Sequence, residues 1–180
     1  MKDKCSIRLT GTGGQGLILA GIILAEAALL EGKNAVQSQS YGPEARGGAS
    51  KAEVIIADGP IHYPKIMESD YLLSMSEKAY DKYKGGMGEN SVLIVDSTFV
   101  EAGENPKAGK IYSIPITQIA IEKTGREMTA NIVALGIFSG LGLVDHDALK
   151  TAVLHRIPKG TEELNMKALE AGMNAINAAI

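Results

Sequence analysis

Residues 6–30 read SIRLTGTGGQGLILAGIILAEAALL, which is a β-favouring run, a glycine turn and a long apolar stretch in succession. Ser6 to Thr10 predicts a buried strand, and Leu17 to Leu30 carries apolar residues at helical spacing. The glycines between them match the spacing G-x-G-x-x-G at Gly11, Gly13 and Gly16. The stretch therefore predicts a strand, a tight turn and a helix, the opening unit of an α/β fold.

The rest of the chain alternates apolar runs with segments of helical periodicity. Strands are predicted at residues 35–40, 51–57, 71–74, 91–96 and 110–114. Helices are predicted at residues 65–68, 77–83, 116–123, 129–139, 145–155 and 161–179. Several connections are too short to hold a crossover helix, which favours a mixed sheet over a purely parallel one. The pattern predicts a single domain over residues 1–180, a three-layer α/β/α Rossmann-like fold with a mixed sheet and a helical C-terminal third.

The composition narrows the class of protein. The chain has 180 residues, a formal net charge of −3 and 45% apolar residues, which suits one globular domain. Because the weak acidic balance offers no basic surface to a phosphate backbone, nucleic acid is not an expected partner. The longest apolar stretch, residues 17–25, falls short of the roughly 20 residues that cross a bilayer, so no membrane span is expected. The N-terminus shows no leader pattern, and we expect a cytoplasmic protein.

No residue pattern predicts a catalytic group. Cys5 is the single cysteine, so this chain alone forms no internal disulfide, no CxxC zinc site and no cysteine-bound iron-sulfur cluster. The three histidines fall on different predicted elements without metal-ligand spacing, and no metal site is predicted. No G-x-S-x-G motif marks a nucleophile. Asp96 ends an apolar strand, where it suits a functional carboxylate or a cap for the next turn, and it is not assigned a catalytic role.

The glycine turn is a candidate anion-binding site, because N–H groups at a helix N-terminus face a phosphate and absent Cβ atoms permit close approach. The candidate cofactor-binding residues are Gly11, Thr12, Gly13, Gly14, Gln15 and Gly16. One alternative is a turn that serves tight packing only. Another is dinucleotide binding, which needs an acidic residue about 20 residues further on, where Gln37 to Ser40 stand instead. A P-loop is excluded, because Leu17 occupies the place of the required lysine.

A second glycine-rich loop follows the next predicted strand. Its candidate binding residues are Tyr41, Gly42, Pro43, Glu44, Arg46, Gly47 and Gly48. The guanidinium of Arg46, flanked by bare backbone, suits recognition of a phosphate or carboxylate, or an ion pair across a subunit interface. The alternative is a rigid surface turn with solvated charges. In an open α/β sheet both loops would border one crevice.

Three motifs together resemble the gamma subunit of the 2-oxoacid:ferredoxin oxidoreductases. They are the turn at 11–16, the stretch SYGPEARGG at 40–48 and the stretch ELNMKALEAG at 163–172. The resemblance spans nearly the whole chain. The second motif is most similar to the 2-oxoglutarate and branched-chain 2-oxoisovalerate branches, whereas the first is shared with the pyruvate and indolepyruvate enzymes. We prefer the 2-oxoglutarate branch. The alternatives are the 2-oxoisovalerate or pyruvate branch, and a stand-alone Rossmann-like dinucleotide-binding protein.

The resemblance implies a role within an enzyme complex. The reaction would be CoA-dependent oxidative decarboxylation of a 2-oxoacid to acyl-CoA and CO2, with reduction of ferredoxin. Thiamine diphosphate, Mg and iron-sulfur clusters would belong to partner alpha and beta subunits, with or without a ferredoxin-like delta subunit. This chain would hold none of them and would be inactive alone. Its two glycine loops become candidates for contact with CoA phosphates or for subunit docking. A subunit without its partners would expose the apolar surface that they normally cover, so the isolated chain would be able to form a homodimer.

Overall fold

The computed structural model describes residues 4–40, 48–103 and 107–180. Six strands form one sheet in the order β2-β3-β1-β4-β5-β6. Their bounds are β1 Lys4–Thr12, β2 Asn34–Ser40, β3 Ala49–Ala57, β4 Ser69–Ser74, β5 Met87–Asp96 and β6 Ala108–Ile114. Strand β3 pairs antiparallel with both β1 and β2, whereas β1, β4, β5 and β6 run parallel to one another. The mixed sheet is confirmed.

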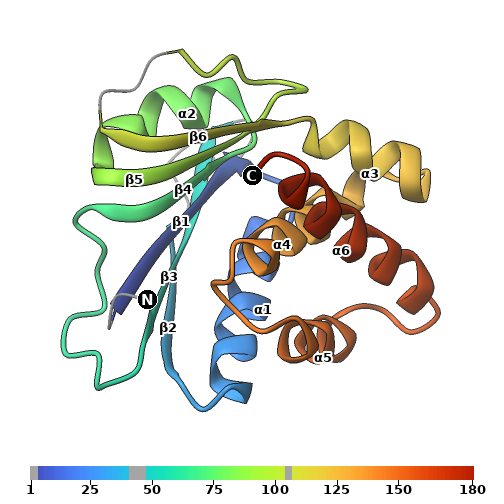
Figure 1. The fold of residues 1–180 in the computed structure, drawn as a ribbon, viewed down its shortest axis with the longest axis horizontal. Coiled ribbons are helices and arrows are strands. Elements are labelled where there is room, and N and C mark those ends of the chain that lie inside the picture. The colour runs from blue at the N-terminus through green and yellow to red at the C-terminus, as the bar shows by residue number, and fades with distance from the viewer. Residues whose placement is uncertain (1–3, 41–47, 104–106) are drawn as a thin grey trace.

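Helices cover the two faces of the sheet unequally (Figure 1). Their bounds are α1 Leu17–Leu30, α2 Glu77–Tyr83, α3 Ile116–Thr124, α4 Ala130–Gly140, α5 His146–Arg156 and α6 Glu162–Asn177, with short 3₁₀ turns η1 Lys84–Gly86 and η2 Glu127–Thr129. Successive side chains of a strand point to opposite faces. Leu73 of β4 accordingly joins the large core beneath α1 and the C-terminal helices, and Leu72 joins a smaller core with Tyr80 of α2. The expected α/β fold with C-terminal helices is confirmed, with only α2 on the second face among the described helices.

Two glycines bring α4 and α6 into backbone contact. A Cβ on Gly136 of α4 would collide with the carbonyl of Leu169, and one on Gly172 of α6 would collide with the carbonyl of Val133. Protein interiors have no slack for such overlap. Gly172 ends the C-terminal motif that carried the family resemblance, so that part of the motif serves packing between two helices.

The predicted helix at residues 65–68 is wrong. The chain runs irregularly between Ala57 and Ser69. Within that segment the carbonyl of Ile66 accepts a hydrogen bond from Arg8 Nη2 at 3.1 Å, so this carbonyl is bonded to a side chain of β1. Four residues are also too few for a helix that lacks other support.

Candidate functional site

The glycine turn joins the end of β1 to the start of α1. Gly16 occupies the N-cap position in a left-handed conformation with a φ of 71°, and Gly14 has a φ of 95°. Both conformations favour glycine. Gly13 and Gly14 are exposed, and a Cβ on either would meet nothing within 4 Å. The backbone of the turn therefore stands open to a ligand at these two positions.

The side chain of Gln15 fastens the turn to the neighbouring strand. Its Oε1 accepts from the backbone N–H of Thr12 at 2.8 Å, and its Nε2 donates to the carbonyl of Met75 at 3.0 Å. Met75 directly follows β4. A Cβ on Gly11 would collide with the Gln15 amide, which explains why that position carries no side chain. Gln15 is thus bonded on both sides within the protein and acts as a positioning residue.

Asn131 holds the other end of the turn. This side chain at the start of α4 is 5% exposed, and its Nδ2 donates to the carbonyl of Gly16 at 3.2 Å. A Cβ on Gly16 would lie 2.5 Å from the same nitrogen. The first turn of α1 carries no acidic residue and no side-chain cap, so its N–H groups keep the partial positive charge of a helix N-terminus. The turn is fixed from two sides with that charge at its centre.

The described end of the second loop lies beside the turn. In the β1–β3 ladder Gly11 pairs with Ser50 and Thr12 with Ala49, and Ser50 Oγ donates to the Gly11 carbonyl at 3.3 Å. Gly48, just before β3, is buried next to this ladder end. The other predicted residues of that loop fall outside the described residues; they are Tyr41, Gly42, Pro43, Glu44, Arg46 and Gly47. Their part in the site stays a prediction.

The sheet order does not favour the dinucleotide alternative. In that fold the second strand lies parallel beside the first, so that an acidic residue at its end reaches the ribose. Here β3 separates β2 from β1, and β2 is paired only with β3 at the sheet edge. The end of β2 is therefore displaced by one strand from the place where a ribose contact is needed.

Asp96 is a structural cap. It is fully buried at the end of β5, where Oδ1 accepts from the N–H of Thr98 at 3.0 Å. Its Oδ2 accepts from the N–H of Thr117 at 3.1 Å and from Thr117 Oγ1 at 2.5 Å. Oδ1 thus caps the turn that follows β5, and Oδ2 attaches the start of α3 to the sheet. Of the two interpretations of Asp96, these bonds favour the cap.

The structure presents no metal centre or membrane helix in the part of the chain that it describes. Across residues 4–40, 48–103 and 107–180, no three His, Cys, Asp or Glu side chains are grouped as a metal would require. Within the same ranges, no helix has the length and apolar character needed to span a bilayer.

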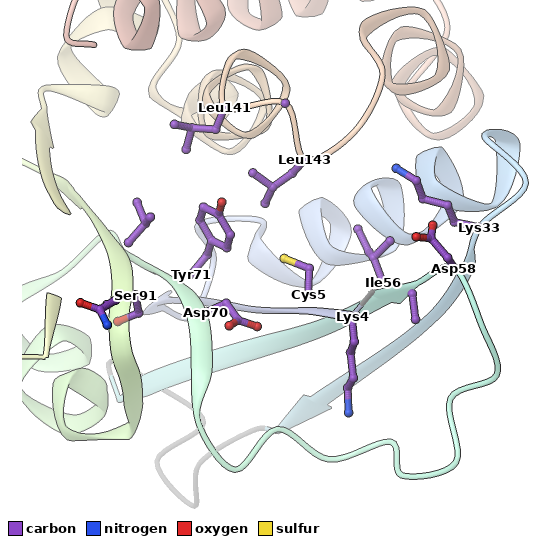
Figure 2. A pocket seen from close by; sticks show the side chains of 14 residues that line it. Lys4, Cys5, Lys33, Ile56, Asp58, Asp70, Tyr71, Ser91, Leu141 and Leu143 are labelled. Atoms are coloured by element: carbon purple, nitrogen blue, oxygen red, sulfur yellow. The ribbon is translucent and has the colours of Figure 1, made fainter. Parts of the chain in front are cut away.

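A separate pocket opens at the other end of β1. It has a volume of about 340 Å³ and is lined by Lys4, Cys5, Lys33, Ile56, Ala57, Asp58, Asp70, Tyr71, Asn90, Ser91, Val92, Leu141, Gly142 and Leu143 (Figure 2). The pairing of β4 with β5 is irregular here, because Ser69 pairs with Met87 and Tyr71 already pairs with Val92. Such irregularities open a sheet locally. No sequence motif marks this pocket, since its walls come from distant segments.

Known proteins resemble the chain over nearly its whole length. The family model for pyruvate ferredoxin/flavodoxin oxidoreductase matches residues 6–175. The 2-oxoglutarate synthase subunit KorC of Methanocaldococcus jannaschii is 48% identical over 175 residues, which cover 96% of this chain and 94% of that protein. The gamma subunit of a keto/oxoacid ferredoxin oxidoreductase from Geobacter sulfurreducens superposes with a TM-score of 0.88 at 47% identity, covering 98% of both chains.

A third relative shows likeness of fold alone. The 2-oxoglutarate:ferredoxin oxidoreductase of Magnetococcus marinus, solved with 2-oxoglutarate, coenzyme A and succinyl-CoA bound, has a TM-score of 0.89 at 21% identity. The match covers 99% of this chain and 32% of the longer one. The same fold therefore also occurs as one part of a larger polypeptide.

Proposed function

The chain belongs to the pyruvate ferredoxin/flavodoxin oxidoreductase family as a gamma subunit of the 2-oxoglutarate:ferredoxin oxidoreductase type, and from this premise we propose that its glycine turn binds CoA in the assembled enzyme. The observation that carries the proposal is the fixed turn at the N-terminus of α1, with open backbone at Gly13 and Gly14. A helix N-terminus of this kind favours phosphate groups.

The proposed substrate is 2-oxoglutarate. Relatives named as 2-oxoglutarate synthase subunits are 40–48% identical to this chain. A relative named as a ketoisovalerate oxidoreductase subunit is 31% identical, and one named as a pyruvate synthase subunit is 34% identical. The oxoacid would lose CO2, its remaining acyl carbon would become a CoA thioester, and the electron pair released would reduce ferredoxin.

Partner subunits supply the redox chemistry in this proposal. One cysteine cannot hold an iron-sulfur cluster alone, and thiamine diphosphate with Mg is likewise assigned to the alpha and beta subunits. The complex consists of these subunits either with or without a ferredoxin-like delta subunit. The task left to this chain is to bind the CoA phosphates and to keep them in place while the thioester forms.

Each part of the turn has a distinct part in CoA binding. The N–H groups of the turn and of the first turn of α1 would face the pyrophosphate, where Gly13 and Gly14 leave room for it. Gln15 and Asn131 would keep the backbone in this shape through the bonds to Met75 and Gly16. Arg46 stands two residues before Gly48 in the sequence, and its guanidinium would pair with a CoA phosphate.

Subunit docking is the second candidate role for the same edge. Met128 in η2 is 84% exposed and stands three residues before Asn131, whose side chain bonds to Gly16. An apolar side chain so exposed next to a candidate site suits a surface that a partner covers. CoA binding and docking are compatible if the partner subunit closes over the bound CoA.

The test uses the assembled complex and substrate-dependent viologen reduction at varied CoA concentration. Gly13→Val and Arg46→Ala should each raise the KM for CoA about tenfold, since each removes a close or charge-assisted phosphate contact. The KM for 2-oxoglutarate should not change. Gly59→Val and Lys150→Ala are matched controls, because both residues are exposed and far along the chain from the turn.

The two roles give different results in this test. If the variants lose the partner subunits on gel filtration and the remaining complexes keep the parent KM for CoA, the edge serves subunit docking and does not bind CoA. An unchanged KM for CoA together with intact assembly in both variants overturns the proposal for this edge. If 2-oxoisovalerate or pyruvate is turned over with a higher kcat/KM than 2-oxoglutarate, the substrate assignment is wrong.

A further inference from the structure

We propose that the pocket at the amino end of β1 binds an apolar α-amino acid in its zwitterionic form. This inference goes beyond the proposed function, because the pocket lies at the opposite end of β1 from the glycine turn. It rests on three features of the pocket: an apolar interior, a mouth with charges of both signs, and a volume that suits such a ligand.

The interior of the pocket is apolar. Figure 2 shows Tyr71, Leu141 and Leu143 near one another, with Cys5 and Ile56 following beside them along the sheet. Cys5 and Ile56 are paired in the β1–β3 ladder, and both lie on the helix-covered face of the sheet. Small-molecule sites are mostly apolar with a few polar groups that orient the ligand. A branched or aromatic side chain is the ligand part that this interior suits.

Charges of both signs stand at one end of the pocket. Lys33 and Asp58 line that end in the view of Figure 2. Lys33 Nζ pairs with Glu31 Oε2 at 2.7 Å, but an ammonium has three donors and keeps capacity for a ligand carboxylate. The exposed carboxylate of Asp58 can accept from a ligand ammonium. A simple anion would meet repulsion from Asp58 and Glu31, and a simple cation would leave the remaining donors of Lys33 without a ligand acceptor.

Other charged residues of the lining are turned away from this end. Lys4 belongs to the opposite face of the sheet from Cys5, since neighbouring strand residues alternate, and Figure 2 shows its side chain leaving the pocket. Asp70 accepts a hydrogen bond from the backbone N–H of Ser6 at 2.9 Å. Lys33, its partner Glu31 and Asp58 therefore set the charge pattern at the mouth.

The size and the fixed walls of the pocket fit this ligand class. A volume of about 340 Å³ lies at the lower end of the range of about 300–1,000 Å³ usual for small-molecule pockets and leaves room for leucine or phenylalanine. Glu31 also accepts from the N–H of Asp145 at 2.6 Å, so it ties the mouth to the connection that carries Leu141 and Leu143. The pocket is thus formed before any ligand arrives.

Calorimetric titration of the full chain with L-phenylalanine tests the proposal. Phenylpyruvate, which lacks the ammonium group, and phenethylamine, which lacks the carboxylate, are the matched ligands. Each should bind about tenfold more weakly than phenylalanine, because each loses one charge-assisted contact. Asp58→Asn should weaken phenylalanine by a similar factor and leave phenylpyruvate unchanged or tighter.

A second measurement uses the single thiol. Because Cys5 lines the pocket and no other cysteine exists in the chain, bound phenylalanine should slow alkylation of Cys5 by iodoacetamide. Lys33→Gln is the alternative variant and should reduce this protection. Absence of heat and of protection, or phenylpyruvate binding as tightly as phenylalanine, overturns the proposal. Neither measurement uses CoA or enzyme turnover, so failure here leaves the proposed function untouched.

Discussion

The guanidinium of Arg8 donates to the carboxylate of Glu53 at 2.7 Å, and both side chains are buried on the face of the sheet opposite α1. Arg8 also donates to the carbonyls of Gly86 and Ile66, each at 3.1 Å. One side chain of β1 thus holds η1 and the irregular segment before β4 against the sheet. Removing the guanidinium would take one donor from each of these three acceptors, although Lys51 Nζ would still donate to Glu53 and Ser69 Oγ to the Gly86 carbonyl.

Arg8→Met is therefore expected to lower the free energy of unfolding by about 3–5 kcal/mol, the usual result of breaking a buried ion pair. Lys51, whose Nζ lies 3.0 Å from Glu53 Oε1, keeps its pair with that carboxylate and reduces this loss. Urea unfolding followed by circular dichroism gives the value. Lys167→Met, in an exposed pair with Glu163, is the control. A similar loss in both variants would falsify the assignment.

Gly172→Ala should destabilise the domain through the contact of α6 with α4. The added methyl group would overlap the Val133 carbonyl, and overpacking of this kind costs about 1–3 kcal/mol or more. Gly59→Ala is the matched control, because a Cβ there meets nothing within 4 Å. Thermal unfolding of both variants is the measurement. Equal melting temperatures would show that the two helices separate without cost.

Gln15→Leu should loosen the glycine turn while the fold persists. The substitution removes the bonds to Thr12 and Met75, which together contribute about 1–3 kcal/mol locally. Amide hydrogen exchange at residues 11–16 should accelerate, and in the assembled enzyme the KM for CoA should rise with kcat unchanged. Gln118→Leu, on the exposed side of α3, is the control. Unchanged exchange in the turn would contradict the positioning role.

Glu26 links α1 to α5 and should make stability depend on pH. Burial opposes ionisation of its carboxyl group, but hydrogen bonds from His155 and Arg156 outweigh that effect and lower the pKa of Glu26 below its ordinary value of 4.5. Because the unfolded chain takes up this proton first, the contribution is fully present above that value and is lost as pH falls below it.

Glu26→Gln should flatten this part of the pH dependence. The urea midpoint should change less between neutral pH and several acidic pH values in the variant than it does in the parent protein. Glu170→Gln, an exposed residue of α6, should keep the parent slope. Persistence of the full acid slope in Glu26→Gln would mean that other carboxyl groups produce it.

Local signals in the sequence predicted those helices whose ends are marked by a capping residue or a turn glycine. Leu17–Leu30 and Glu77–Tyr83 were predicted with the bounds that the structure shows. The first begins at a glycine that tolerates a left-handed φ, and the second begins at Ser76, whose hydroxyl accepts from the N–H of Ala79. Caps of this kind act within a few residues. Residues 65–68 have no such signal, and there the predicted helix was wrong.

Contacts between residues far apart in the chain could not be predicted from the sequence. The family resemblance and the helix start pointed to the turn at residues 11–16, yet Asn131, which fixes Gly16, stands 115 positions away. The place of β3 between β1 and β2 depends on strand pairing rather than on either strand alone. The pocket likewise arises only when Cys5, Tyr71 and Leu143 come together.

Cys5 and Thr12 stand seven positions apart on β1, so at about 3.3 Å per residue their Cα atoms are separated by up to about 23 Å along the strand. This exceeds the screening distance of about 8 Å at physiological ionic strength. A fluorophore on Cys5 would thus lie at a fixed distance from the glycine turn, and charges bound at the turn would be screened from it. Energy transfer from this fluorophore to a labelled partner subunit would therefore report how far from Cys5 that subunit binds.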